Sequence, residues 1–183
     1  MRPQTRPPAR LVVAGALAVS VATIAAACAP SGARPVPAAS CSVPINERLD
    51  PRSTRHLFPG ATEPRYLTDP PTSGPHQLGP AAQGVVTTAI SRTKQVSMLE
   101  DGFVILQYRE LSPAQLATLS SLAGRQVTVA PAAGPLPSLV VATAWTWKLA
   151  CESLSPAAIS ALRSFVATHR GVGFATNLNP ASG

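Results

Sequence analysis

Aromatic and charged residues are scarce in this sequence of 183 residues. Phe, Trp and Tyr make up 4% of it and the four charged residue types 13%, whereas apolar residues reach 45%. So few charges exclude an acidic disordered chain and a coiled coil, and the apolar content is sufficient for one folded domain. The sequence also lacks any run of five or more basic residues, which argues against nucleic acid as a partner.

Common enzyme motifs are missing as well. The sequence has no G-x-S-x-G elbow, no Walker loop, no G-x-G-x-x-G fingerprint and no C-x-x-C. Only three histidines and three cysteines occur, which leaves few pairs of nucleophile and base. These absences weaken the case for an enzyme and favour a binding function.

The first 27 residues are typical of an export signal. Three arginines precede the uncharged run 11–27, which ends in three alanines directly before Cys28. This pattern resembles a bacterial lipoprotein signal, in which the thiol of Cys28 accepts a lipid. The alternatives are an ordinary signal peptide cut after Ala27 and an uncleaved anchor, for which 17 alanine-rich residues are short. We expect a lipid-anchored protein at the extracytoplasmic face of the cell membrane.

The other two cysteines form an even pair. If Cys28 carries a lipid, Cys41 and Cys151 remain, and an oxidising compartment favours a disulfide between them. Two buried thiols are the alternative. The disulfide would close a loop of about 110 residues, for which the chain-entropy treatment gives about 4–5 kcal/mol.

Composition divides the chain into four parts. Residues 1–27 are the predicted signal peptide, 28–40 a Pro/Ala-rich tether, 41–175 a folded domain and 176–183 a flexible tail. The first part of the domain, residues 41–83, contains eight prolines and has no apolar periodicity. Because each proline removes a backbone donor, we expect a long structured loop there.

Regular structure is predicted from residue 84 onward. Apolar and β-branched runs predict strands over 85–90, 103–108, 126–130 and 139–149. Two Ser-Pro starts followed by spaced apolar residues predict helices over 113–123 and 156–170. We therefore expect an α+β fold, in which a small mixed sheet of about four strands carries two packed helices after the Pro-rich loop.

Several single residues have a simple structural interpretation. Alternation along one strand places Trp145 and Trp147 on the same face, where aromatic residues more often pack than bind a ligand. His56 is expected to be an exposed loop residue. His169 stands near a helix C-terminus, where a positive charge would suit the helix dipole.

Two segments resemble the DUF3105 family of exported or membrane-anchored bacterial and archaeal proteins of uncharacterised function. Residues 66–76 read YLTDPPTSGPH and match its PPTSGPH motif. Residues 97–102 read SMLEDG and match its H-x-L-E-H-G motif, which precedes an apolar strand. The resemblance extends over about residues 57–172.

The resemblance implies a candidate site. The histidines of the two family motifs, with the glutamate between them, look like a metal or acid–base site. Here Ser97 and Asp101 replace two of the histidines, while His76 and Glu100 are retained. A set of His76, Glu100 and Asp101 would suit a hard or borderline cation, and Met98 would offer a thioether to copper(I). The loss of two imidazoles favours a degenerate site.

Three functions remain open at this point. The main expectation is a non-enzymatic lipoprotein that binds a protein, a cell-wall component or a small ligand through the loop around His76. The alternative is an extracytoplasmic protein that holds copper or zinc with His76 and Glu100. A weaker alternative is a hydrolase in which His76 is the general base.

Overall fold

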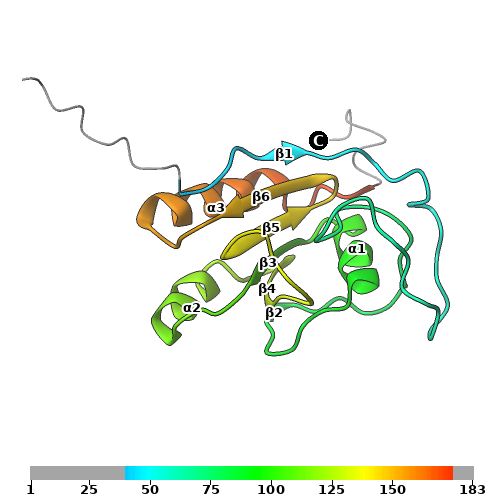
Figure 1. Ribbon diagram of the computed structural model, residues 1–183, viewed down its shortest axis with the longest axis horizontal. Helices are drawn as coiled ribbons and strands as arrows, with labels where there is room; N and C mark the ends of the chain where they lie inside the picture. Colours follow the sequence, from blue (N-terminus) through cyan, green and yellow to red (C-terminus); the bar gives the residue numbers. More distant parts are fainter. Residues whose placement is uncertain (1–39, 175–183) are drawn as a thin grey trace, which may run out of the picture. The chain divides into compact units, whose positions relative to one another are not determined.

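The computed structural model describes residues 40–174 of the chain (Figure 1). These residues belong to the second of two units into which the chain divides, Pro37–Gly183. The predicted signal peptide 1–27, the tether with Cys28 as far as residue 39, and the predicted tail 176–183 lie outside the described residues. In the described part, no helix is both long enough and apolar enough to cross a membrane.

Six strands form one mixed sheet. They are β1 (Ile45–Asn46), β2 (Gly84–Val85), β3 (Val104–Tyr108), β4 (Val127–Pro131), β5 (Val140–Ala144) and β6 (Trp147–Cys151). Their order across the sheet is β1-β6-β5-β3-β4-β2. Strand β4 runs parallel to β3 and β2, and the other neighbours are antiparallel. The α+β class is confirmed, but four strands and two helices were too few: strand β1 was not predicted, and β5 and β6 were predicted as one strand.

Three helices cover the two faces of the sheet. They are α1 (Arg92–Glu100), α2 (Pro113–Ser120) and α3 (Pro156–His169). Figure 1 shows α1 on one side of the sheet and both other helices on the opposite side. Alternation along β3 divides the core accordingly, because Val104 and Leu106 pack toward α2 and α3, whereas Ile105 packs toward α1. The candidate site residues near α1 are therefore separated by the sheet from α3.

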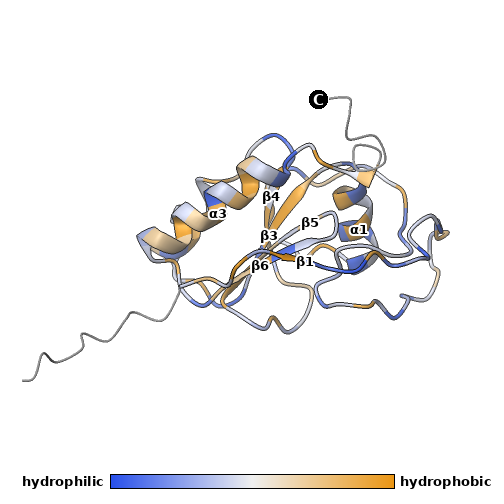
Figure 2. Ribbon diagram, turned by 90° about the horizontal axis from the view of Figure 1, so that it is seen from above, coloured by the Kyte–Doolittle hydropathy of each residue, from blue (hydrophilic) through white to orange (hydrophobic). Residues whose placement is uncertain are grey.

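Helix α1 was not predicted from the sequence, because half of its buried residues are polar. Thr93, Gln95 and Ser97 are all buried, so the segment shows no apolar stripe, and Figure 2 shows α1 with hydrophilic as well as hydrophobic residues. The side chains of Gln95 and Gln107 exchange two hydrogen bonds of 3.1 Å. Gln95 also donates to the carbonyl of Ile90 at 2.6 Å. Pairing of these amides makes a polar helix stable against the sheet.

The predicted strand 139–149 is a hairpin in the structure. The chain reverses at Trp145 and Thr146, and Thr146 has a positive φ of 60°. The reversal places the two tryptophans on opposite faces of the sheet, so the same-face prediction is wrong. Trp145 packs in the core beside α1, whereas Trp147 packs against the core beside α3.

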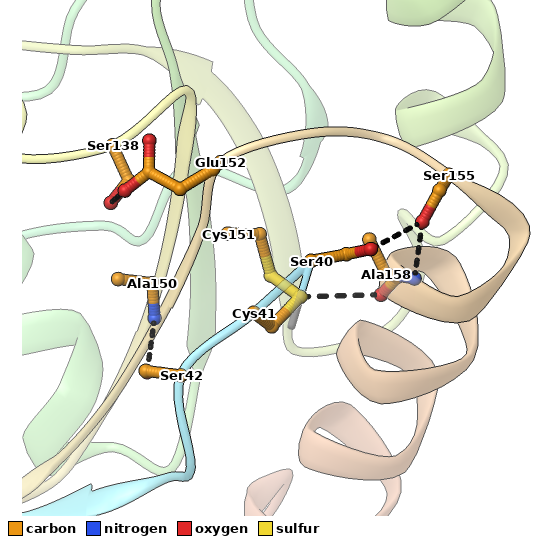
Figure 3. Close-up of a disulfide and its surroundings, with 9 residues drawn as sticks. All are labelled: Ser40, Cys41, Ser42, Ser138, Ala150, Cys151, Glu152, Ser155 and Ala158. Carbon is orange, nitrogen blue, oxygen red and sulfur yellow. Dashed lines mark hydrogen bonds between the residues drawn. A yellow bond between two sulfur atoms is a disulfide. The ribbon is translucent and has the colours of Figure 1, made fainter. Parts of the chain in front are cut away.

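The predicted helix starts and the predicted disulfide are confirmed. Ser112 forms a capping box with Gln115 at the start of α2, and the Ser155 hydroxyl caps α3. Cys41 and Cys151 form a disulfide that joins the start of the described chain to the end of β6 (Figure 3). Within the predicted loop 41–83, residues 47–83 contain no named helix or strand, whereas the short strand β1 lies in its first part.

Candidate metal centre

The segment that carries His76 is clamped by a turn at residues 50–53. The Ser53 hydroxyl donates to the Asp50 carbonyl at 2.6 Å and accepts from the Gly74 N–H at 3.0 Å. The Asp50 N–H donates to the Ser73 hydroxyl at 2.9 Å. Arg52 donates to the Asp50 carboxylate, and these hydrogen bonds lower the pKa of that carboxyl below its usual value of 3.8. An ionised, fully paired carboxylate therefore stabilises the turn that carries the clamp.

The Tyr66 ring explains why the PPTSGPH motif has glycine at position 74, and it also contacts Pro75. Gly74 has a φ of +127°, and a Cβ there would lie 2.9 Å from a ring carbon of Tyr66. The Tyr66 hydroxyl donates to the Pro75 carbonyl at 2.9 Å. Only glycine fits under this ring, and the ring in turn fixes the backbone directly before His76.

His56 is placed beside His76 by backbone pairing. The Leu57 N–H donates to the His76 carbonyl at 2.7 Å, and the His76 N–H donates to the Arg55 carbonyl at 3.1 Å. These bonds make a parallel bridge between His56 and His76. Directly bridged residues project their side chains to the same side, and the two ring centroids lie 4.9 Å apart. His56 is exposed, as the sequence predicts, yet its ring contacts the buried one.

Glu100 approaches from the end of α1. It is the last residue of that helix, and its carboxylate oxygen Oε2 lies 2.7 Å from His76 Nε2. The Glu100 side chain is 21% exposed, whereas that of His76 is fully buried. The carboxylate of Glu100, at the end of α1, therefore lies against the buried imidazole of His76 on the proline-rich loop.

The hydrogen bonds of His76 define which ring nitrogen is free. Its Nδ1 lies 3.2 Å from the Gly74 carbonyl, which can only accept, so Nδ1 carries the proton. In the neutral ring Nε2 then keeps its lone pair. This buried nitrogen makes no hydrogen bond, although the Glu100 carboxylate oxygen lies 2.7 Å from it. A lone pair beside a carboxylate is unfavourable unless a proton or a cation lies between them.

The three side chains together make a cluster that fits a metal ion. One ligand atom each from His56, His76 and Glu100 lies within 4.8 Å of the other two. Zinc donors at about 2.0–2.2 Å from the ion lie about 3.3–3.5 Å apart in a tetrahedral site. For all three donors to bind one ion, the exposed His56 side chain would move closer and the 2.7 Å between His76 Nε2 and Glu100 Oε2 would widen. The unpartnered Nε2 is the donor that a metal would use.

The structure brings together two of the four residues predicted from the sequence and adds a third. His76 and Glu100 meet, whereas Met98 lies two positions before Glu100, about 200° around the helix, and is buried in the core. Asp101 is exposed beyond the end of α1, and within residues 40–174 it is not part of the three-residue cluster.

His56 was missed because no spacing pattern links it to the PPTSGPH motif. The scarcity of histidine was the one available signal, since two of three histidines in the chain meet at this site.

Ser97 occupies a family histidine position on the same helix. It precedes Glu100 by three residues, so the two share one face of α1. An imidazole at position 97 would project toward the face that carries Glu100. In this chain the second imidazole comes instead from His56, on the Pro-rich loop.

Comparison with other proteins identifies the family. The family described as "Protein of unknown function (DUF3105)" matches residues 60–177, which is more than half of the chain. The matched segment includes His76 and Glu100 but not His56. Neither the curated proteins nor the solved structures gave a match. The chain belongs to the DUF3105 family.

Proposed function

We propose that this protein is an exported, membrane-tethered lipoprotein that binds one zinc or cupric ion through His56, His76 and Glu100. The observation that carries the proposal is the buried His76 Nε2, which lacks a hydrogen-bond partner and lies 2.7 Å from a carboxylate oxygen. A bound cation would take up the lone pair of Nε2 and neutralise the Glu100 charge at once.

The donor set selects the kind of ion. Two imidazoles and one carboxylate suit borderline divalent ions such as Zn²⁺ and Cu²⁺. Copper(I) prefers sulfur, and Met98 is buried in the core away from the cluster. Magnesium and calcium prefer oxygen donors throughout. We therefore expect Zn²⁺ and Cu²⁺ to bind and Mg²⁺ and Ca²⁺ to leave the site empty.

The surroundings of His76 suit a ligand better than a general base. Its ring is fully buried, and the Gly74 carbonyl fixes its tautomer and orientation, as second partners do for metal-bound histidines. Three protein donors leave a coordination position for water or for a group from another molecule. With His56 exposed at its edge, this arrangement supports binding and exchange of the ion.

Export is supported by the sequence and by the disulfide. The arginines, the apolar run 11–27 and the alanines before Cys28 have the order of a lipoprotein signal. The Cys41–Cys151 disulfide suits an oxidising compartment. Fractionation of cells that express the protein tests the anchor: we expect the native chain in the membrane fraction and a Cys28→Ala variant outside it. A Cys28→Ala chain that stays fully membrane-bound would contradict a lipid anchor.

Calorimetric titration of the untagged full-length protein with Zn²⁺ and Cu²⁺ tests the metal site. We expect one ion per chain and a loss of affinity of about 10-fold or more in His56→Ala and Glu100→Gln. Asp101→Asn is the matched control, because it removes the neighbouring carboxylate that lies outside the cluster. Equal affinity in Glu100→Gln and the native chain would contradict the proposal, as would equal losses in Glu100→Gln and Asp101→Asn.

A further inference from the structure

An apolar cleft lies on the other side of the sheet from the metal centre. It has a volume of about 410 Å³ and runs between α3, β6 and the segment that follows the disulfide. Its lining includes Pro44, Trp147, Leu149, Ala161, Phe165 and His169. This volume falls within the range of small-molecule sites, which are mostly apolar and carry a few polar groups.

The sequence builds the walls of this cleft in a regular way. Ala161, Phe165 and His169 follow one another at intervals of four residues, so they form one stripe along α3. Trp147 and Leu149 alternate on β6 and face that stripe. The small side chain of Ala161 leaves the space open between larger neighbours.

The third wall is held in place by covalent and hydrogen bonds. The disulfide between Cys41 and Cys151 fixes the start of this segment to β6 (Figure 3). Directly after it, the Ser42 N–H donates to the Ala150 carbonyl at 2.8 Å, and the Ala150 N–H donates to the Ser42 hydroxyl at 3.2 Å. Pro44 then lines the cleft and has no N–H that would need a partner there.

His169 is the polar group of the cleft. Its ring packs between Phe165, at a centroid distance of 4.4 Å, and Trp147, at 4.9 Å, and the residue is 8% exposed. Among residues 40–174, no hydrogen bond or ion pair engages its ring nitrogens. Burial lowers the pKa of His169 below its usual value of 6.5, so the expectation of a charged histidine serving the helix dipole is not supported. A neutral imidazole retains one N–H to donate.

We propose that this cleft binds a medium-chain carboxylic acid, with its hydrocarbon chain in the cleft and its carboxylate at His169. The apolar walls match the hydrocarbon chain, and the His169 N–H, which has no protein partner among residues 40–174, can donate a hydrogen bond to a carboxylate oxygen. A sugar would need more polar partners than this lining offers. The inference does not depend on the metal centre, which lies on the other face of the sheet.

Titration of the full-length protein with decanoate and with decanol tests the proposal. Binding is followed by the NMR signal of the Trp147 indole N–H, a group in the cleft wall. We expect saturable binding of both molecules to the native chain. Ala161→Phe fills the cleft and should abolish the binding of decanoate and of decanol. The matched control is Ala167→Phe, the same change on the exposed side of α3, which should bind both as the native chain does.

His169→Phe distinguishes the contribution of the carboxylate from that of the hydrocarbon chain of the ligand. It keeps an aromatic ring between Trp147 and Phe165 but removes the N–H, so we expect decanoate affinity to fall about 10-fold while decanol affinity stays the same. Thermal melting of each variant verifies that it is folded. No saturable binding to the native chain, unchanged binding to Ala161→Phe, or unchanged decanoate affinity in His169→Phe would each overturn the proposal.

Discussion

Removal of the Cys41–Cys151 disulfide should destabilise the protein severely. The bond joins residues 110 positions apart, so it restricts most of the unfolded domain. For a closed loop of this length, the chain-entropy relation predicts that loss of the bond lowers the free energy of unfolding by about 4.8 kcal/mol at 25 °C. For a chain of this size each kcal/mol corresponds to about 2–4 °C, so the melting temperature should fall by about 10–19 °C.

Urea unfolding followed by tryptophan fluorescence measures this loss. The double variant Cys41→Ala/Cys151→Ala is compared with the oxidised and the reduced native chain. The reduced chain keeps both sulfur atoms, so its difference from the oxidised chain isolates the effect of the cross-link. We expect both open forms to lose similar stability. A loss below about 1 kcal/mol in the reduced chain would refute the reasoning, because the unfolded loop would then not be restricted by the bond.

Three further predictions concern the His76 loop and the cleft histidine. Gly74→Ala should lower the free energy of unfolding by about 1–3 kcal/mol in urea, because a Cβ at this positive φ meets the Tyr66 ring. The same variant should bind zinc more weakly in calorimetry. An unchanged free energy of unfolding and an unchanged zinc affinity would contradict this prediction. Tyr66→Phe should cost about 1 kcal/mol in the same unfolding assay, because the Pro75 carbonyl loses its donor; a stability equal to the native chain would contradict the assigned bond. Because the pKa of His169 is lowered in the folded protein, the unfolded chain binds the proton more tightly. The free energy of unfolding, measured with a chelator present, should therefore fall as the pH drops below 6.5. The same pH slope in a His169→Phe chain would contradict this prediction.

The central strands and the two capped helices could be predicted from local signals. The apolar run before Tyr108 gave a buried strand, and Ser112 and Ser155 gave helix starts that the structure confirms. Helix α1 gave no such signal, because the amide pair of Gln95 and Gln107 stabilises it across the core. Long-range pairing of this kind leaves no periodic pattern in the sequence.

The candidate site could be predicted only in part for the same reason. His76 and Glu100 stand within motifs, so the family resemblance pointed to both. His56 reaches the site through a bridge between two irregular segments, held by the Leu57 N–H and the Arg55 carbonyl. Such a bridge depends on how a proline-rich loop folds back, which composition and spacing do not encode.

X-ray absorption spectroscopy of the zinc-loaded full-length protein tests the metal site most directly. The account predicts nitrogen and oxygen donors at about 2.0–2.2 Å with the scattering signature of two imidazoles, and of one imidazole in His56→Ala. A spectrum with sulfur donors, or one that His56→Ala leaves unchanged, would contradict the assignment of His56, His76 and Glu100 as the ligands.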